Sequence, residues 1–278
     1  SINKNINQFK NIISVDGDKS LSIRFVLLSS LSTGKCVGVN LLRSEDVMSA
    51  ISCIKKLGIK IRFKNNNCEI FGKGLHGYKY SKKLILDAGN SGTTARLLCS
   101  VLIDSNKWIK ITGDKSLKKR DMERIIKPLK LFGVKFKNKS KTLPILMKGT
   151  KSLNPIKFEE KLGSAQCKSA VMIAALKTKG KTKLKCLPSR DHTELMFKNV
   201  LNIPINVIKK KNYDIIEING LKEFKQFNYK IPGDISSASF FIVLTLLANK
   251  SSLLIKSVNI NPSRIGIIKV LNMMGSKI

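Results

Sequence analysis

Four apolar stretches of helix length recur along the chain, and each follows a short turn of small or polar residues. They begin with the segments GDKSLSIRFVLL, GNSGTTARLLCSVL, GSAQCKSAVMIAAL and GDISSASFFIVLTLL. Small polar residues before an apolar run are typical of a helix N-terminus, so the pattern predicts four helices. In register, the turns repeat at intervals of about 72 residues, with these residues aligned: Ser20, Gly92, Ser164 and Ser236.

A second set of predicted helices alternates with the first. Each starts at a serine and runs into a short strand-like segment, and the serines are Ser44, Ser116, Ser189 and Ser263. Segments rich in β-formers, such as KCVGVNLL, KWIKITG, TKLKCLP and SLLIKSVNI, connect the two kinds of helix. The repeating unit is therefore strand–helix–strand–helix–strand with one further strand, and the predicted fold class is α/β.

Three complete units occupy about residues 18–230. A fourth begins at about residue 231 and stops midway, at Ile278. We expect the chain to be a fragment of a longer protein.

The charge of the chain at first suggests a nucleic-acid-binding protein, because 52 lysines and arginines against 18 acidic residues give a formal net charge of +34. However, arginines are few, aromatic residues make up 6%, and the lysines are spread along the whole chain beside many asparagines and isoleucines. Nucleic-acid-binding proteins usually cluster their basic residues and add arginine forks or stacking rings. We therefore expect no nucleic acid among the partners.

The remaining composition indicates a cytoplasmic protein without a metal or a membrane partner. His76 and His192 are too few and too far apart to suggest a metal site. The N-terminal segment lacks the apolar region of a secretory signal, and the apolar stretch 240–248 is too short to span a bilayer. No CxxC pair occurs, so we expect reduced, buried thiols at all six cysteines: Cys36, Cys53, Cys68, Cys99, Cys167 and Cys186.

Basic residues occupy the same place in three of the four repeats. Four residues after each aligned position come Arg24, Arg96 and Lys168, whereas the fourth repeat has Phe240. A cation one turn into a helix opposes the helix dipole, so three such cations suggest that a bound anion offsets the effect. The alternative is that each cation packs along a buried helix or pairs with an acidic residue across the core.

Further polar groups lie at the same helix starts. Lys19 and Ser20 place an ammonium and a hydroxyl before the first helix, and Arg120 places a guanidinium at the start of a helix of the second set. Arginine binds phosphate and carboxylate through charge-assisted hydrogen bonds that are often bidentate. The arrangement favours two small anionic substrates bound where several helix N-termini meet.

The segments GDKSLSIR, LDAGNSGTTARLL, TGDKSLKKRDM, GSAQCKSA, PSRDHTE, PGDISSASFF and NPSRIGII follow one another along the chain. Together they resemble the motifs of the 3-phosphoshikimate 1-carboxyvinyltransferase (EPSP synthase) family. The resemblance implies an inside-out α/β barrel of two globular domains, each built from three βαβαββ units. Residues 1–17 would then supply a strand to the second domain, residues 18–230 would form the first, and residues 231–278 would begin the second.

The resemblance also implies a reaction. The 5-hydroxyl of shikimate 3-phosphate adds to C2 of phosphoenolpyruvate while C3 is protonated, and phosphate then leaves. The product, 5-enolpyruvylshikimate 3-phosphate, belongs to the shikimate pathway of aromatic amino acid (chorismate) biosynthesis. Such an enzyme is expected to be a monomer, to need no metal or organic cofactor, and to screen two phosphates and a carboxylate.

By motif, the resemblance assigns roles to individual residues. Lys19 would touch both substrates and screen charge during catalysis, and Gly92 would let the backbone approach phosphoenolpyruvate where a Cβ would crowd it. The role of Arg96 stays open between a ligand contact and helix packing. The implied contacts to phosphoenolpyruvate are Lys19, Gly92, Arg120 and Gln166. The implied contacts to shikimate 3-phosphate are Lys19, Ser20, Arg24, Ser164, Ala165, Gln166 and Ser189, with Arg190 as an alternative to Ser189.

The chain departs from the family pattern at two of these motifs. Ala165 replaces a serine found in many members, so its contact with a ligand is limited to backbone or van der Waals contact. Asp121 stands where a proline usually follows the arginine, and it adds a negative charge near an anion site. The proton-transfer aspartate of the family lies in repeats that this sequence does not contain, so we expect the 278-residue chain to be inactive alone.

Two other functions compete with this interpretation. The UDP-N-acetylglucosamine enolpyruvyl transferase family uses the same donor, but it generally carries a cysteine before the clamp arginine, and GDKSLKKR has none. That family is also expected to have Lys-Asn where this chain has Lys19 and Ser20. A basic nucleic-acid-binding scaffold would instead bind nonspecific nucleic acid with a steep salt dependence.

Overall fold

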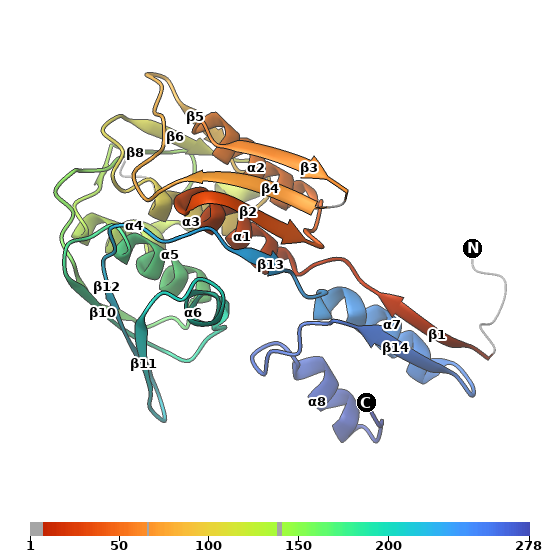
Figure 1. Cartoon of the computed structure of the whole chain (residues 1–278). Coiled ribbons are helices and arrows are strands. Elements are labelled where there is room, and N and C mark those ends of the chain that lie inside the picture. Colours follow the sequence, from red (N-terminus) through yellow and green to blue (C-terminus); the bar gives the residue numbers. More distant parts are fainter. Residues whose placement is uncertain (1–7, 66, 138–140) are drawn as a thin grey trace.

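Three four-stranded sheets dominate the structure, a computed structural model that describes residues 8–65, 67–137 and 141–278 (Figure 1). The first sheet has the strand order β13-β2-β4-β3, with β2 (Thr33–Val39), β3 (Lys60–Lys64), β4 (Asn67–Lys73) and β13 (Asn228–Lys230). The second has the order β5-β6-β8-β7, with β5 (Ile85–Asp87), β6 (Ile109–Thr112), β7 (Lys135–Phe136) and β8 (Ile145–Lys148). The third has the order β11-β12-β10-β9, with β9 (Lys157–Glu160), β10 (Lys181–Cys186), β11 (Ile205–Lys209) and β12 (Asp214–Asn219).

The three sheets share one pairing pattern. In each, a single edge strand (β13, β5 or β9) runs parallel to its neighbour, and the other neighbours are antiparallel. The first sheet takes its parallel edge strand from far along the chain, since β13 lies beside β2 with Asn228 opposite Val37. Residues near 230 therefore supply the edge strand of a sheet whose first strand begins at residue 33.

Alternation of polar and apolar residues gives each sheet a buried and an exposed face. In β10, Leu184 and Cys186 are buried while Lys183 and Lys185 face solvent. Successive side chains of a strand point to opposite faces of the sheet, so the lysines of such a strand gather on the outer face. The apolar residues are left to cover the helices.

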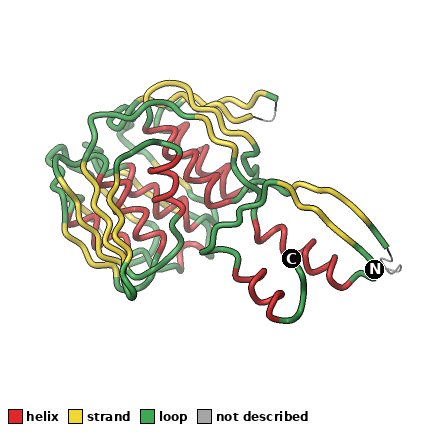
Figure 2. Tube along the Cα trace, turned by 60° about the horizontal axis from the view of Figure 1, so that its bottom comes forward, coloured by secondary structure: helices red, strands yellow, loops and turns green. Residues whose placement is uncertain are grey.

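The helices that begin at the first three aligned turns lie inside the molecule. Figure 2 shows helices in the middle of the larger part, with strands around them. Three of them, α1 (Lys19–Leu31), α3 (Gly92–Val101) and α5 (Ala165–Ala175), are buried on nearly all sides, as expected for helices that are apolar all round. The others, α2 (Glu45–Lys56), α4 (Glu123–Leu131) and α6 (His192–Asn199), bury one face.

The predicted starts of the first set of helices are confirmed to within two residues. Each has an N-cap side chain that accepts a hydrogen bond from the first turn: Asp18 for α1, Ser91 for α3, Ser164 for α5 and Asp234 for α7 (Ile235–Leu247). Such caps satisfy backbone N–H groups that have no partner inside the helix. The polar turns in the sequence are therefore the caps themselves.

The prediction that a serine caps each helix of the second set is wrong in three of four cases. Ser44 does occupy the N-cap position of α2, but without a side-chain cap bond. Ser116 precedes only a short 3-10 turn (η1, Leu117–Lys119), and the carboxylate of Asp114, not the serine hydroxyl, accepts the N–H of Leu117. Helices α6 and α8 (Gly266–Met273) begin after Ser189 and Ser263, and the hydroxyl of Ser263 donates to Asn261.

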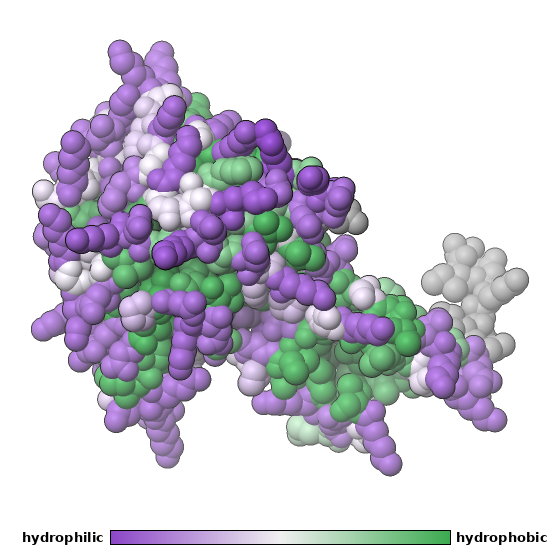
Figure 3. Space-filling view, in the orientation of Figure 1, coloured by the Kyte–Doolittle hydropathy of each residue, from purple (hydrophilic) through white to green (hydrophobic). Residues whose placement is uncertain are grey.

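A smaller part of the structure follows β13. Strand β14 (Ser252–Lys256) pairs in parallel with β1 (Lys10–Ser14), so the beginning of the described chain lies against its end. Val15, Ile235 and Ala238 form a small core there. Large apolar side chains of α7 and α8 remain exposed, and Figure 3 shows the apolar surface gathered over this part.

The α/β class predicted from the sequence is confirmed, but the described strands form open sheets and no closed barrel. All six cysteines are buried and unpaired, and burial raises the pKa of Cys99 to about 12. None of the helices in the described ranges combines the length and the apolar composition that crossing a bilayer requires. Within the same ranges no cluster of three potential metal ligands occurs.

Candidate functional site

The first two turns of α1, α3 and α5 meet through their side chains, and most of the predicted site residues lie at this junction. Arg24 of α1 reaches Ser169 of α5, and Gln166 of α5 reaches Thr93 of α3. Since the backbone N–H groups of a helix are unpaired at its N-terminus, this junction gathers positive partial charge from three helices. The sequence prediction that helix starts come together is confirmed for these three.

At the start of α1, Lys19 is exposed and Arg24 is buried. The ammonium of Lys19 lies 2.8 Å from a carboxylate oxygen of Asp46 at the start of α2. Arg24 donates to Thr193 Oγ1 (2.8 Å), to Ser169 Oγ (2.8 Å) and to the carbonyl of Ser20 (3.0 Å). Burial lowers the pKa of Arg24 to about 10, so it stays charged at neutral pH. Three of its N–H groups are committed to the protein, which leaves two for a ligand.

Arg96 connects α3, α5 and the loop that carries Arg120. Its guanidinium donates to Gln166 Oε1 (2.6 Å) and to the carbonyl of Asp121 (2.9 Å). The amide of Gln166 in turn donates to Thr93 Oγ1 (2.9 Å). Burial, and then the nearby charges of Arg124 and Arg120, lower the pKa of Arg96. Arg96 therefore contacts Gln166, a predicted ligand residue, and its own role stays open between a ligand contact and helix packing.

Two guanidinium groups flank Gly92. A Cβ atom on this glycine would lie 3.0 Å from Nη1 of Arg96 and 3.3 Å from Nη1 of Arg120. Arg120 is exposed and donates to Asn90 Oδ1 at 3.0 Å. The Cα of Gly92 therefore faces two guanidinium groups, and an anion bound beside it would meet both.

The carboxylate of Asp121, unexplained from the sequence, has a local role. One of its oxygens accepts the N–H of Glu123 at 2.9 Å, at the beginning of α4. The other lies 3.4 Å from Nε of Arg124. Asp121 therefore serves the start of α4, and its charge is shared with Arg124.

The three cations aligned in the sequence do not have the same environment. Lys168 is fully buried, and its ammonium lies 2.5 Å from a carboxylate oxygen of Glu194 and donates to the carbonyl of Ser189. For Lys168 the alternative interpretation, a buried cation paired with an acidic residue, is thus correct, and the interpretation as part of an anion site is wrong. In the fourth repeat Phe240 is 78% exposed.

The remaining predicted residues lie around α5 and α6. Ser164 caps α5 by accepting the N–H of Cys167, and Ala165 is buried. Ser189 is held by its carbonyl at Lys168, and its hydroxyl is buried without a hydrogen-bond partner in the described part of the chain. Arg190 is exposed.

Sequence reasoning missed Thr193 and Asp46, which contact Arg24 and Lys19. Thr193 lies within the motif PSRDHTE, so the motif itself was the available signal. Asp46 gives no such signal, because its contact with Lys19 depends on how α1 and α2 pack.

A cavity of about 1150 Å³ lies apart from these residues, at the opposite ends of the buried helices. Its lining includes Tyr78, Asp104 and Lys177, and Lys177 donates to the last-turn carbonyl of Val101 in α3. None of the predicted site residues lines it. The candidate site, at the starts of the buried helices, is therefore separate from this cavity.

An α/β protein that gathers lysine and arginine side chains over the starts of buried helices has the features of a protein that binds small phosphorylated or carboxylated molecules. The family model for EPSP synthase (3-phosphoshikimate 1-carboxyvinyltransferase) matches residues 3–278, and the chain belongs to this family.

Curated relatives and solved structures agree with this family. The 3-phosphoshikimate 1-carboxyvinyltransferase of Caldicellulosiruptor saccharolyticus is 42% identical over 270 residues, which is 96% of this chain and 61% of the relative. That of Streptococcus mutans is 38% identical over 277 residues, covering 99% of this chain and 64% of the relative. An EPSP synthase structure from Acinetobacter baumannii superposes with a TM-score of 0.86 at 34% identity, over 98% of this chain and 60% of that one. The chain thus spans about three fifths of the proteins it matches.

Proposed function

We propose that this chain binds shikimate 3-phosphate and phosphoenolpyruvate for transfer of the enolpyruvyl group to the 5-hydroxyl of shikimate 3-phosphate, giving 5-enolpyruvylshikimate 3-phosphate and phosphate. The observation that carries the proposal is the position of Gly92 against the guanidinium groups of Arg96 and Arg120, together with the cations Lys19 and Arg24 at the α1 start. Family membership supports the same reaction, since the matched relatives bear the enzyme's name.

The proposed roles follow from position. Arg120 and the backbone at Gly92 hold phosphoenolpyruvate, and Gln166, fixed by Arg96, lies between the two ligands. Lys19 exchanges its ion pair with Asp46 for contacts to both substrates and screens their charges as the new bond forms. For shikimate 3-phosphate the proposed contacts are Lys19, Ser20, Arg24, Ser164, Ala165, Gln166 and Ser189.

The architecture that accompanies this function is also a proposal. We assign residues 18–230 to one domain of three βαβαββ units, and residues 1–17 and 231–278 to a second domain of an inside-out α/β barrel. The shared strand order of the three sheets and the separate core at Val15 support this division. A monomeric, cytoplasmic enzyme is the state we propose for it.

Full turnover, in our proposal, requires residues that the relatives carry outside the matched region. Residues 1–278 alone should bind shikimate 3-phosphate but form no measurable 5-enolpyruvylshikimate 3-phosphate. The chain spans only about three fifths of its relatives, and the proton-transfer aspartate expected from the family is not among the assigned residues. Substantial product formation by the 278-residue chain would contradict this.

Replacing Lys19 tests the proposed site. Calorimetric titration of the unmodified chain with shikimate 3-phosphate should show saturable binding, and Lys19→Met should weaken it about tenfold or more, because one charge-assisted contact is lost. Lys35→Met is the matched control: Lys35 also forms an ion pair, with Glu69 at 3.2 Å, but lies on β2. No saturable binding, or equal losses in both variants, would refute the proposal. Salt-steep binding of nonspecific DNA would instead favour the nucleic-acid alternative.

Gly92→Ala tests the close approach of phosphoenolpyruvate. The added methyl must push aside the guanidinium of Arg96, which it would meet at 3.0 Å, and it would lie 3.3 Å from Nη1 of Arg120, where the proposed anion contacts that group. Phosphorus-31 NMR titration in saturating shikimate 3-phosphate should show phosphoenolpyruvate binding about 10- to 100-fold weaker, with shikimate 3-phosphate affinity changed by less than about threefold. Equal losses for both ligands would contradict the close-approach argument.

A further inference from the structure

Two chain segments cross at the junction between the larger and the smaller part of the structure. Asp18 N–H donates to the carbonyl of Pro232 (2.8 Å), and Asp234 N–H donates to the carbonyl of Asp16 (2.9 Å). Each segment ends in an aspartate that caps the next helix: Asp18 accepts from Leu21 N–H at 3.0 Å, and Asp234 accepts from Ser236 N–H at 2.8 Å. The crossing therefore brings two carboxylates together.

Arg264, in the loop before α8, provides the cation that faces both carboxylates. Its Nη2 lies 3.1 Å from Oδ1 of Asp234 and 3.9 Å from Oδ2 of Asp18, and it donates to Ser236 Oγ at 2.9 Å. The side chains are shielded from water, with Asp18 only 1% exposed and Arg264 17%. A neutral group, the amide of Asn259, completes the surroundings of Asp18 at 3.2 Å.

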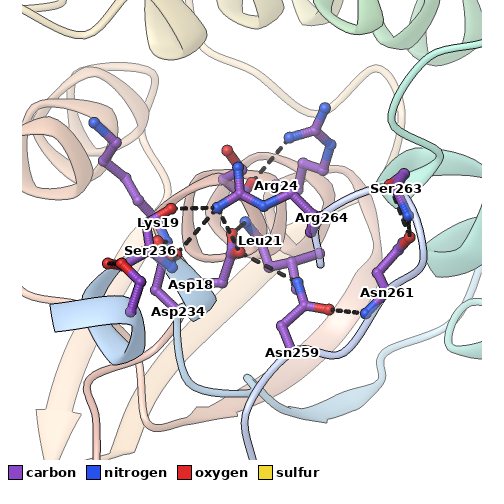
Figure 4. Close-up of polar contacts among 12 residues, drawn as sticks. Asp18, Lys19, Leu21, Arg24, Asp234, Ser236, Asn259, Asn261, Ser263 and Arg264 are labelled. Atoms are coloured by element: carbon purple, nitrogen blue, oxygen red, sulfur yellow. Dashed lines mark hydrogen bonds and ion pairs between the residues drawn. The ribbon is translucent and has the colours of Figure 1, made fainter. Parts of the chain in front are cut away.

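These carboxylates also lie at the start of α1, which is the proposed shikimate 3-phosphate site. Asp18 directly precedes Lys19, and Asp234 accepts the backbone N–H of Lys19 at 3.4 Å. Figure 4 shows the side chains of Arg264, Asp18 and Asp234 clustered beside Lys19 and Arg24. Uncompensated, two carboxylates in this place would oppose the binding of an anion.

We propose that Arg264 is a positioning residue for the shikimate 3-phosphate site: it neutralises the capping carboxylates of Asp18 and Asp234 and so keeps the start of α1 electropositive. The inference rests on the proposed function, because it concerns the same ligand. It adds a residue from the far side of the crossing, about 240 positions beyond α1, to a site otherwise built from residues 19–190.

A purely structural role for Arg264 makes a different set of predictions. If the arginine only ties the loop before α8 to the rest of the chain, the shape of the guanidinium matters and its charge does not. If it acts through charge, lysine should replace it, and removal of one carboxylate should compensate for its loss. Asparagine is as good a helix cap as aspartate, so Asp234→Asn removes the charge while keeping the cap of α7.

The test measures shikimate 3-phosphate affinity by calorimetry at low and high salt. Arg264→Gln should raise the dissociation constant about three- to tenfold at low salt, and less at high salt. Arg264→Lys should stay within about twofold of the unmodified chain, and Arg264→Gln combined with Asp234→Asn should return to that value. Arg43→Gln is the matched control, since Arg43 packs over the Phe63 ring at 4.7 Å, outside the crossing.

The outcomes separate the two proposals. Binding by the unmodified chain with no change in Arg264→Gln would overturn the role of Arg264 alone. A loss that lysine does not repair and Asp234→Asn does not compensate would show a structural tie and also overturn it. Absence of binding by the unmodified chain would overturn the proposed function, and with it this inference.

Discussion

Replacing Glu194 by glutamine should lower the free energy of unfolding of the chain by about 3–5 kcal/mol, because it leaves the ammonium of Lys168 buried without a counter-charge. Lys168 is fully buried, Glu194 is 8% exposed at its side chain, and the two groups lie 2.5 Å apart. The amide would keep the shape of Glu194 while removing its charge. Urea unfolding followed by circular dichroism provides the measurement.

Two controls isolate the buried pair. Lys168→Met combined with Glu194→Leu removes both charges and should recover most of the lost stability, since a buried ion pair can be replaced by apolar residues of similar size. Glu159→Gln breaks an ion pair with Lys185 in which both side chains are about half exposed, and it should cost less than about 1 kcal/mol. Similar losses in Glu159→Gln and Glu194→Gln would show that burial of the pair is not what makes it important.

The second large effect is a loss of stability in mild acid that depends on His192. This side chain is 3% exposed, and burial, followed by the charge of Arg24, lowers its pKa from 6.5 to about 4. Between pH 6.5 and pH 4, His192 is therefore protonated in the unfolded chain but neutral in the folded chain. The free energy of unfolding is highest above pH 6.5 and decreases as the pH falls through this range. The loss amounts to about 3 kcal/mol by pH 4.

The measurement is urea unfolding at several values between pH 7 and pH 4, for the unmodified chain and His192→Gln. The variant should have a flatter dependence on pH, because glutamine does not titrate. The charged groups facing His192 are the guanidinium groups of Arg24, Arg190 and Arg264 and the carboxylate of Asp18, and the three cations all disfavour a protonated ring. Parallel curves for the two proteins would show that His192 does not cause the acid sensitivity.

The starts of the buried helices could be predicted from the sequence because their signal is local. A small polar side chain before a long apolar run both caps the helix and marks it, as Ser91 and Ser164 do. The second set of helices lacked so clear a signal. Aspartates such as Asp114 and Asp121 accept the backbone N–H groups at these starts, so a prediction based on the nearest serine chose the wrong residue.

The members of the candidate site could be listed from motifs, but their connections could not. Arg96 and Lys168 occupy equivalent positions in the repeat, yet one donates to Gln166 and the other pairs with Glu194. The difference depends on which side chains the neighbouring helices present, and periodicity along one helix does not encode that. The role of Arg264 was missed for the same reason, since its partners Asp234 and Asp18 lie 30 and 246 residues earlier in the chain.

The pairing of β1 with β14 has a consequence for synthesis of the chain. Lys10 lies opposite Ser252 and Ser14 opposite Lys256, so β1 leaves the ribosome about 240 residues before its partner, an interval of roughly 12–50 s at ordinary translation rates. The strands of all three large sheets, between residues 33 and 230, emerge within that interval. Strand β1 therefore has no β14 partner while the three large sheets are being synthesised, and its backbone N–H and C=O groups stay unpaired with that strand. Because strand pairing is much faster than translation, the rate of translation limits when β1 and β14 pair.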